Sequence, residues 1–302
     1  MTLTPAVLHN NSLRLTVLPE LGSCIAGLEL KHQGFWLPVM RPMSVAAVAE
    51  GSSPDSSSYI LAPYSNRIRD GRFSFGGENF QLKPNWPDGR MTIHGEVHAR
   101  AWQTVERSAE VLTCRFAADA GLNFPFTYAV EAGFRLDGPV LELDLRLTNT
   151  SAGPMPAGLG HHPYFMRRLG SSGDPLVQFK AEMVYLTDET RIPAGPAAAI
   201  PADLDFGRPR AVGPTFIDNV FSGWDGRLSA DWGHFKMTLE AQPVFSHLVM
   251  FTAPDGTLAL EPVTHATDGF NLMSQGHADT GVRVLEPGET LQGKVWIKLE
   301  GR

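Results

Sequence analysis

The chain has little of what marks several common classes of protein. Its 302 residues include two cysteines, Cys24 and Cys114, too few for a disulfide framework or a four-cysteine zinc site. We interpret both as buried thiols that pack as small apolar side chains. No apolar run approaches the roughly 20 residues of a membrane-spanning helix. The N-terminus lacks the charged and apolar regions of a signal peptide. The sequence therefore predicts a cytoplasmic protein with no membrane partner.

Basic side chains are in the minority. The 25 lysines and arginines stand against 32 aspartates and glutamates, which gives a formal net charge of -7. A nucleic-acid-binding surface needs a basic patch, and no run of Lys and Arg supplies one, so we expect no nucleic-acid partner. The chain also lacks a dinucleotide-binding glycine fingerprint and clear metal-ligand spacing, and we therefore expect neither a cofactor nor a metal.

Long helical patterns are scarce as well. Ala194–Ala202 is rich in alanine, but Pro193 precedes it and Pro196 and Pro201 interrupt it, so we interpret it as a loop. Ser44–Ser58 is compatible with a short helix followed by a loop. The sequence instead shows alternation with a period of two. Apolar and charged residues alternate without exception over Leu141–Leu147. Leu13–Val17 and Val295–Leu299 repeat the pattern, and each predicts a strand with one face on a core.

Turn-forming residues separate these strands. The chain has 30 glycines and 23 prolines, and pairs such as Asp137-Gly138 and Asp255-Gly256 lie between the alternating runs. The hydrophobic fraction of 43% is enough for a substantial core. We find no linker and no internal repeat. The sequence therefore predicts an all-β, antiparallel sandwich or barrel, with few short helices and a single domain over residues 1–302.

Two stretches in the first third of the chain carry candidate ligand-binding side chains. In Pro63–Phe73, the Arg67 guanidinium is a rigid fork of donors suited to oxygen ligands, and Asn66 can donate and accept. The alternative is a solvated charged turn. In Ile93–His98, His94 precedes a glycine and could hydrogen-bond a ligand, or it could be an ordinary surface histidine.

Two later stretches carry candidate acid–base groups. Gly158–Phe165 holds His161 and His162 between glycines and a Pro-Tyr-Phe run, and histidine titrates closest to neutral pH. In Leu258–His265, an apolar strand is expected to end at Glu261. A buried carboxylate is costly unless it is paired or used, although an exposed strand-end glutamate is the alternative. A glutamate and a histidine from separate strands can act together as proton acceptor and donor.

Taken in order, five short stretches resemble the motifs of the aldose 1-epimerase (galactose mutarotase) family. They are Asn66–Phe73, Ile93–Gly95 with Trp102, His162–Phe165, Leu260–Pro262 and Leu285–Thr290. The resemblance implies an antiparallel β-supersandwich, which agrees with the period-two strands. It also implies an isomerase that interconverts the α and β anomers of a free sugar without a cofactor.

Roles follow from the resemblance residue by residue. Glu261 would be the general base and His162 the general acid. Arg67 and His94, with Asn66 beside them, would hold sugar oxygens. A sugar-binding aspartate of the family falls on Asp218, within Phe216–Phe221.

The sequence departs from the best-known members beside the motif histidine. His161 stands where those members often have asparagine, and Met166 and Arg167 stand where they have Asn-Leu. On an extended backbone His161 should point away from His162, so we interpret it as a packing residue. A related branch acts on hexose 6-phosphates, and four arginines make a phosphate contact conceivable here: Arg69, Arg72, Arg167 and Arg168.

Other classes of function stay open at this point. The chain could be a carbohydrate-binding module without catalysis, or a structural or regulatory sandwich that binds a protein partner. It could also be a metal enzyme that uses His161, His162 and His265. We expect a small-molecule sugar as partner and a monomer or homodimer, and the sequence leaves the identity of the sugar open.

Overall fold

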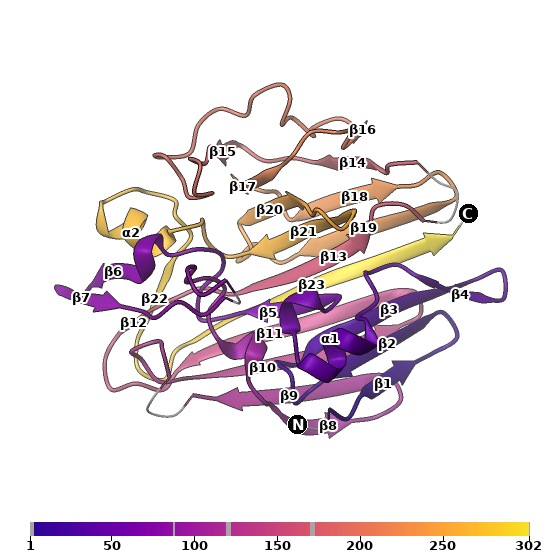
Figure 1. Cartoon of the computed structure of the whole chain (residues 1–302), viewed down its shortest axis with the longest axis horizontal. Coiled ribbons are helices and arrows are strands. Elements are labelled where there is room, and N and C mark those ends of the chain that lie inside the picture. The colour runs from indigo at the N-terminus through magenta and orange to yellow at the C-terminus, as the bar shows by residue number, and fades with distance from the viewer. Residues whose placement is uncertain (1–2, 87, 119–121, 170–172, 302) are drawn as a thin grey trace.

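A computed structural model describes residues 3–86, 88–118, 122–169 and 173–301 of the chain. Within these ranges most strands belong to two large antiparallel sheets (Figure 1). The strands of the first, ten-stranded sheet are, in spatial order, β1 (Ala6–His9), β2 (Leu13–Leu18), β3 (Cys24–His32), β5 (Ser58–Leu61), β13 (Gly160–Met166), β21 (Thr257–Val263), β20 (His247–Thr252), β17 (Asp218–Ser222) and β15 (Met183–Tyr185), with β4 (Phe35–Pro38) paired to β3.

The second sheet has nine strands in the described part of the chain. They are, in spatial order, β16 (Arg210–Ala211), β14 (Leu176–Phe179), β18 (Arg227–Asp231), β19 (Phe235–Ala241), β23 (Thr290–Gly301), β11 (Val140–Asn149), β10 (Tyr128–Asp137), β9 (Val111–Ala117) and β8 (Gln103–Arg107). The smaller elements are the pairs β6 (Arg72–Phe75) with β7 (Glu78–Gln81) and β12 (Met155–Ala157) with β22 (Arg283–Leu285), the helices α1 (Val45–Glu50) and α2 (Gly269–Ser274), and the 3-10 turns η1 (Ser53–Asp55), η2 (Arg69–Gly71) and η3 (Val97–Ala99).

The two sheets pack face to face around one extended apolar core. The four leucines of the predicted strand Leu141–Leu147 are fully buried in it, while the charged residues between them face outward. The first sheet contributes the opposite wall, for example Phe165 of β13 and Leu258 and Leu260 of β21. Burial of one face per strand accounts for the period-two pattern. The predicted all-β, antiparallel supersandwich is confirmed.

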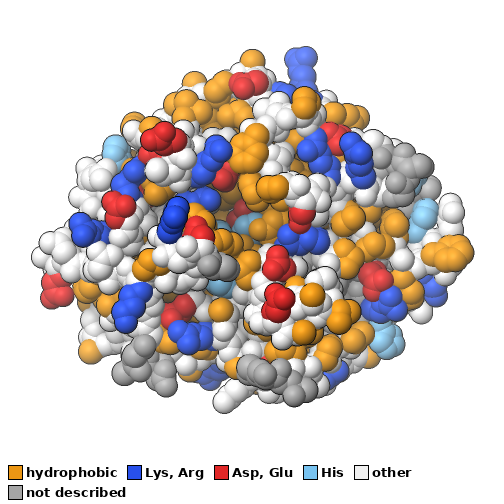
Figure 2. Space-filling view, in the orientation of Figure 1, with side chains coloured by type: hydrophobic (Ala, Val, Ile, Leu, Met, Phe, Trp, Pro, Cys, Tyr) orange, Lys and Arg blue, Asp and Glu red, His pale blue; other side chains and the backbone are white. Residues whose placement is uncertain are grey.

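The outer face of the ten-stranded sheet carries a second, smaller cluster of buried side chains. Tyr59, Tyr164, Val249 and Ala259 belong to it, and they alternate along their strands with residues of the main core. The short helix α1 lies in front of this face in Figure 1, whereas α2 lies at the left edge of the view, beside β6. Near the middle of the same view, Figure 2 shows a hollow with histidine and acidic side chains at its floor.

Several local expectations can be compared with the structure. Ala194–Ala202 contains no helix, as predicted, and Ser44–Ser58 forms the short helix α1 and the turn η1. The helix α2 was not expected, because six residues are too few to display a helical period. The single-domain interpretation stays a prediction. Among the described residues, none of the helices has the length and apolar character needed to cross a membrane.

Candidate active site

A pocket of about 170 Å³ lies on the outer face of the ten-stranded sheet. All six residues that the sequence singled out for the site line it: Asn66, Arg67, His94, His162, Asp218 and Glu261. They come from segments far apart in the chain, and the sheet register brings them together. Pairing of Gly160 with Val263 and of Tyr164 with Ala259 places Glu261 opposite His162 on neighbouring strands.

The ladder between these two strands is interrupted where the two residues face each other. Within the described chain, β13 pairs with β21 before and after residues 161–163 but not along them. Pro163 and Pro262 lie in this interval, and proline has no N–H to donate to a ladder. The expectation that the strand ends at Glu261 was wrong, because β21 continues to Val263 through its pairing with β20.

Glu261 and His162 form a buried contact at the floor of the pocket. The Glu261 Oε1 atom lies 3.2 Å from His162 Nε2, and the side chains are only 2% and 4% exposed. Burial raises the pKa of Glu261 well above its usual range, with Asp218 adding to the effect and Arg67 opposing it. Burial lowers the pKa of His162 well below its usual range, and Arg41 and His161 lower it further. Both shifts favour a pair that carries one proton and no net charge.

Some polar atoms at this floor lack a partner in the described part of the protein. They are Glu261 Oε2, His162 Nδ1, Arg67 Nε and the Tyr59 hydroxyl. Buried polar groups are nearly always hydrogen-bonded. Their convergence on one pocket indicates a site built to receive a polar ligand.

Arg67 and Asp218 face each other at one side of the pocket. Arg67 NH1 donates to Asn66 Oδ1 at 3.1 Å and lies 3.8 Å from Asp218 Oδ2. Burial raises the pKa of Asp218, and Arg67 and Arg191 oppose that rise. This is a loose ion pair between largely buried side chains, so a ligand hydroxyl could bridge donor and acceptor.

His94 is held by the backbone of the Asn66 segment. Its Nδ1 accepts the N–H of Asn66 at 3.1 Å, and the N–H of His94 donates to the Asn66 carbonyl at 2.9 Å. Burial and the neighbouring His162 lower the pKa of His94 well below its usual range. The ring is therefore neutral near pH 7, and its proton sits on Nε2, which makes His94 a hydrogen-bond donor.

Gly95 allows this segment to approach the strand beside it. Its φ is +67°, and a Cβ there would clash with the carbonyl of Ala62, to which Gly95 is bridged. Gly158 is similarly crowded, because its Cβ would meet the His265 ring. The glycines flanking the predicted motifs are thus required by close approach.

The pocket also has apolar and aromatic walls to which the sequence analysis assigned no role. These lining residues are Tyr59, Trp86, Met91, Ile93, Tyr164 and Phe251. For Tyr164 a signal existed, because a strand with a period of two puts residues 162 and 164 on one face. Trp102, which belongs to a motif, lies outside the lining and donates its indole N–H to the Val97 carbonyl.

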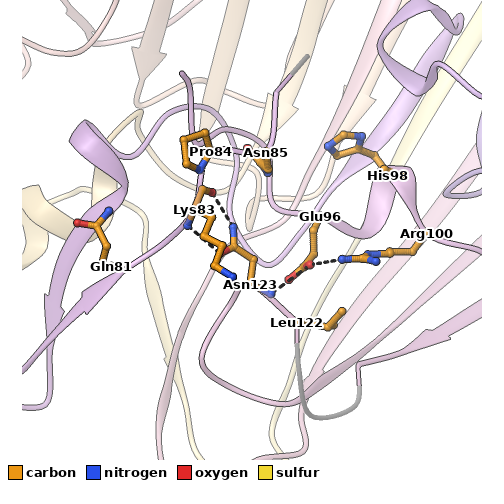
Figure 3. Close-up of a pocket in the computed structure, with 10 residues that line it drawn as sticks. Gln81, Lys83, Pro84, Asn85, Glu96, His98, Arg100, Leu122 and Asn123 are labelled. Carbon is orange, nitrogen blue, oxygen red and sulfur yellow. Dashed lines mark hydrogen bonds and ion pairs between the residues drawn. The ribbon is translucent and has the colours of Figure 1, made fainter. Parts of the chain in front are cut away.

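Larger hollows in the described chain lack this convergence. One of about 520 Å³ adjoins His98, and Figure 3 shows the groups around it. Its carboxylate, Glu96, already accepts from Arg100 and from the N–H groups of Asn123 and Phe124. Its amide, Asn123, is bonded to the backbone of Lys83. A hollow of about 760 Å³ around His247 is set apart from the six predicted residues.

The arginines considered for a phosphate contact point elsewhere. Arg69 pairs with Asp188 at 2.9 Å, Arg72 donates to Gln81, and Arg167 pairs with Asp174. Arg168 is exposed, and none of the four lines the pocket.

The other two histidines of the three-histidine hypothesis also have partners of their own. His161 bonds to the Ser58 hydroxyl on the core side of the sheet. His265 accepts the N–H of Ser65 and contacts the Ala266 carbonyl. No group of three or more potential ligands suited to a metal ion occurs among the described residues.

The structure combines a β-supersandwich with a buried carboxylate–imidazole pair and surrounding hydrogen-bond donors, an arrangement that is chemically able to move a proton on a small polar ligand. The match to known families is specific. The aldose 1-epimerase family model matches residues 6–298, and the chain belongs to that family.

Relatives and solved structures are consistent with this family. Escherichia coli K12 has a protein named uncharacterized protein YphB that is 27% identical over 89% of this chain and 92% of its own length. Mouse galactose mutarotase is 27% identical over 55% of this chain and 49% of its own length. A crystal structure of a candidate aldose 1-epimerase from E. coli K12 covers 100% of both chains at 26% identity, with a TM-score of 0.85.

Proposed function

We propose that the chain is an aldose 1-epimerase that interconverts the α and β anomers of a free hexose. Family membership supports an isomerase of this kind. The observation that carries the finer proposal is the contact of 3.2 Å between Glu261 Oε1 and His162 Nε2 at the floor of the pocket. A protein that only binds sugar has no need of such a buried pair.

The reaction requires two proton transfers and no net change. Ring opening takes a proton from the C1 hydroxyl and gives one to the ring oxygen, so the bond from C1 to the ring oxygen breaks and C1 becomes a carbonyl. Rotation about C1–C2 and closure on the other face reverse these steps. Glu261 accepts the first proton and His162 donates the second, and on closure the two exchange roles.

The electrostatics of the pocket support Glu261 as the proton acceptor and His162 as the proton donor. The pair needs one shared proton, and burial favours the form in which that proton rests on Glu261. Arg67 opposes that preference, since it lowers the pKa of Glu261. Sugar hydroxyls that donate to the carboxylate act in the same direction, so a bound sugar favours the ionised base and the protonated acid.

The remaining polar groups hold the sugar. Arg67 and the His94 Nε2–H donate to sugar oxygens, Asp218 accepts from hydroxyls, and Asn66 fixes the Arg67 guanidinium. Trp86 and Phe251 offer apolar surface to the sugar ring. An unphosphorylated hexose suits this lining better than a hexose 6-phosphate, because Arg69, Arg72 and Arg167 are bonded elsewhere.

The test is a panel of free sugars and hexose 6-phosphates, each dissolved freshly as one anomer and followed by polarimetry. We expect acceleration for at least one free hexose. Acceleration of the 6-phosphates alone would replace the proposal by a hexose-6-phosphate 1-epimerase. Binding without acceleration of any sugar would make the chain a carbohydrate-binding module.

A further inference from the structure

His162 packs against two tyrosine rings on the outer face of the sheet. Its imidazole is stacked on the Tyr164 ring, with centroids 4.5 Å apart, and the Tyr59 ring lies beside it at 4.7 Å, tilted by 32°. The two tyrosine centroids are only 6.4 Å apart, so the rings lie on adjacent rather than opposite sides of the imidazole. The Arg41 guanidinium covers Tyr164 at 3.9 Å from the ring centroid. At the other end, His98 lies 5.4 Å from Tyr59. We call these five residues, Arg41, Tyr164, His162, Tyr59 and His98, the ring cluster.

One short segment anchors both ends of the ring cluster, at Arg41 and at His98. Arg41 NH2 donates to the carbonyls of Pro54 and Ser56 at 2.7 and 2.6 Å, and its NH1 pairs with Asp255. At the opposite end, the Ser53 hydroxyl bonds to His98 Nδ1 at 2.8 Å. The segment Ser53–Ser56 therefore fixes the spacing between the two ends.

The ring cluster takes the place of an interaction that His162 lacks. The orientation of a working histidine is usually set by a hydrogen bond at its second ring nitrogen. His162 Nδ1 is buried, and no group in the described chain bonds to it. The imidazole is restrained by Tyr164, which is stacked on its face, and by the tilted Tyr59 ring beside it, and Tyr164 is in turn covered by the guanidinium of Arg41.

We propose that Arg41 is a positioning residue for His162, which acts through Tyr164 and holds the imidazole plane so that Nε2 faces Glu261. Arg41 does not line the pocket, and its role is distinct from that of the sugar-binding residues. The assignment deepens the proposed function, since it concerns the group that carries the proton.

The charge of Arg41 gives this role a distinct signature. The titratable or charged groups around His162 are Glu261 of β21, Tyr59 of β5, Tyr164 and His161 of β13, His98 of η3, His94 and Arg41. Burial is the main cause of the lowered pKa of His162, and Arg41 is the next. Loss of the arginine therefore moves the pKa of His162 upward, which a purely structural contact would not do.

The experiment compares Arg41→Met and Arg41→Lys with Arg14→Met. Arg14 is a matched control, because it also lies over an aromatic ring, Trp36, and pairs with a carboxylate, but it does so on β2, away from the pocket. Two quantities are measured: the NMR titration of the His162 ring, and kcat and KM for the hexose that is turned over fastest.

We expect Arg41→Met to raise the pKa of His162 and to lower kcat about tenfold to a hundredfold with little change in KM, as misplacement of a reacting group does. Arg41→Lys should keep the titration near that of the wild type but lose part of kcat, because lysine lacks the planar fork. Arg14→Met should change neither.

Wild-type titration and kcat in Arg41→Met would overturn the proposal. If Arg41→Met does not fold, Asp255→Asn weakens the hold on the Arg41 guanidinium instead, and an unchanged kcat and His162 titration in that variant would overturn it as well. Failure of the wild type to interconvert anomers would remove the proposed function instead. The His162 titration would still decide whether Arg41 controls the imidazole.

Discussion

Glu261 and His162 stand opposite each other on neighbouring antiparallel strands, with Oε1 of one 3.2 Å from Nε2 of the other. Both side chains are buried, and each has a second polar atom without a partner in the described chain. In the proposed function the two residues act together as one acid–base pair.

Removing either member of this pair should abolish most of the activity. We expect Glu261→Gln and His162→Asn each to lower turnover by about 10²–10⁴-fold, the usual contribution of a positioned acid or base. The measurement is polarimetry of freshly dissolved α-D-glucose or α-D-galactose, with folding checked by circular dichroism. His161→Asn is the matched control, since His161 bonds to Ser58 on the other face. Near-wild-type rates in the first two variants would refute their roles.

Arg67 and Asp218 should act on binding. We expect Arg67→Ala and Asp218→Asn to raise KM more than they lower kcat, because each removes a hydrogen-bonding group from the pocket wall without touching the Glu261–His162 contact. Steady-state kinetics separates the two effects. A fall in melting temperature with unchanged KM would mean that the ion pair is structural only.

Stability should fall in mild acid because of buried histidines. Burial lowers the pKa of His98, His247 and His265 to about 4 and that of His161 to about 3. Between these values and the ordinary 6.5, the unfolded chain binds protons that the folded chain does not, so the free energy of unfolding decreases as pH falls below 6.5. A shift from 6.5 to about 4 is worth roughly 3 kcal/mol at full effect.

The buried carboxyl of Glu261 works in the opposite direction. The raised pKa of Glu261 stabilises the folded protein at low pH, and this stabilisation is lost as pH rises through the pKa that Glu261 has in the folded state. Glu261 is one group, whereas several buried histidines act in the opposite direction. The measurement is the urea midpoint at pH 7.5, 6.5 and 5. His247→Gln should flatten the decline, whereas replacement of the exposed His234 should not. A midpoint that does not change with pH would contradict the prediction.

The close approach at Gly95 should make that position intolerant of a side chain. Gly95→Ala forces a clash with the Ala62 carbonyl in addition to the cost of a positive φ. Gly138→Ala is the matched control, because Gly138 has a φ of +51° and open space around its Cβ position. We expect a loss of about 1–2 kcal/mol in the control from the left-handed backbone alone, and a clearly larger loss at Gly95. Equal losses in denaturant unfolding would show that the segment shifts to accommodate the methyl group.

Much of the fold and of the pocket could be predicted from the sequence. Alternation over Leu141–Leu147 predicted a strand, and short motifs singled out Arg67, His162 and Glu261, which the sheet then brings into one pocket. These signals are local: a period, a glycine beside a histidine, a carboxylate in an apolar run. Their relative placement required the resemblance, since no local rule sets which strands are neighbours.

The rest depends on contacts between distant segments. Nothing in the residues around Arg41 indicates that its guanidinium covers Tyr164, because the carbonyls that hold it belong to Pro54 and Ser56 in a turn with no periodic pattern. The sequence around Tyr59 predicts only that it belongs to an apolar strand. The position of Glu261 inside β21 was missed because Pro262 suggests the end of a strand, whereas the pairing of Leu248 with Pro262 continues it.

The interruption between β13 and β21 has a mechanical consequence. Glu261 and His162 are in contact, so a ligand atom can pass between them only if the two side chains move apart. The β5–β13 ladder holds β13, and the β20–β21 ladder holds β21. Between β13 and β21, no residues pair along 161–163 within the described chain. The two strands can therefore separate at that row without losing a paired residue, while the pairs at Gly160 and Tyr164 limit how far they separate.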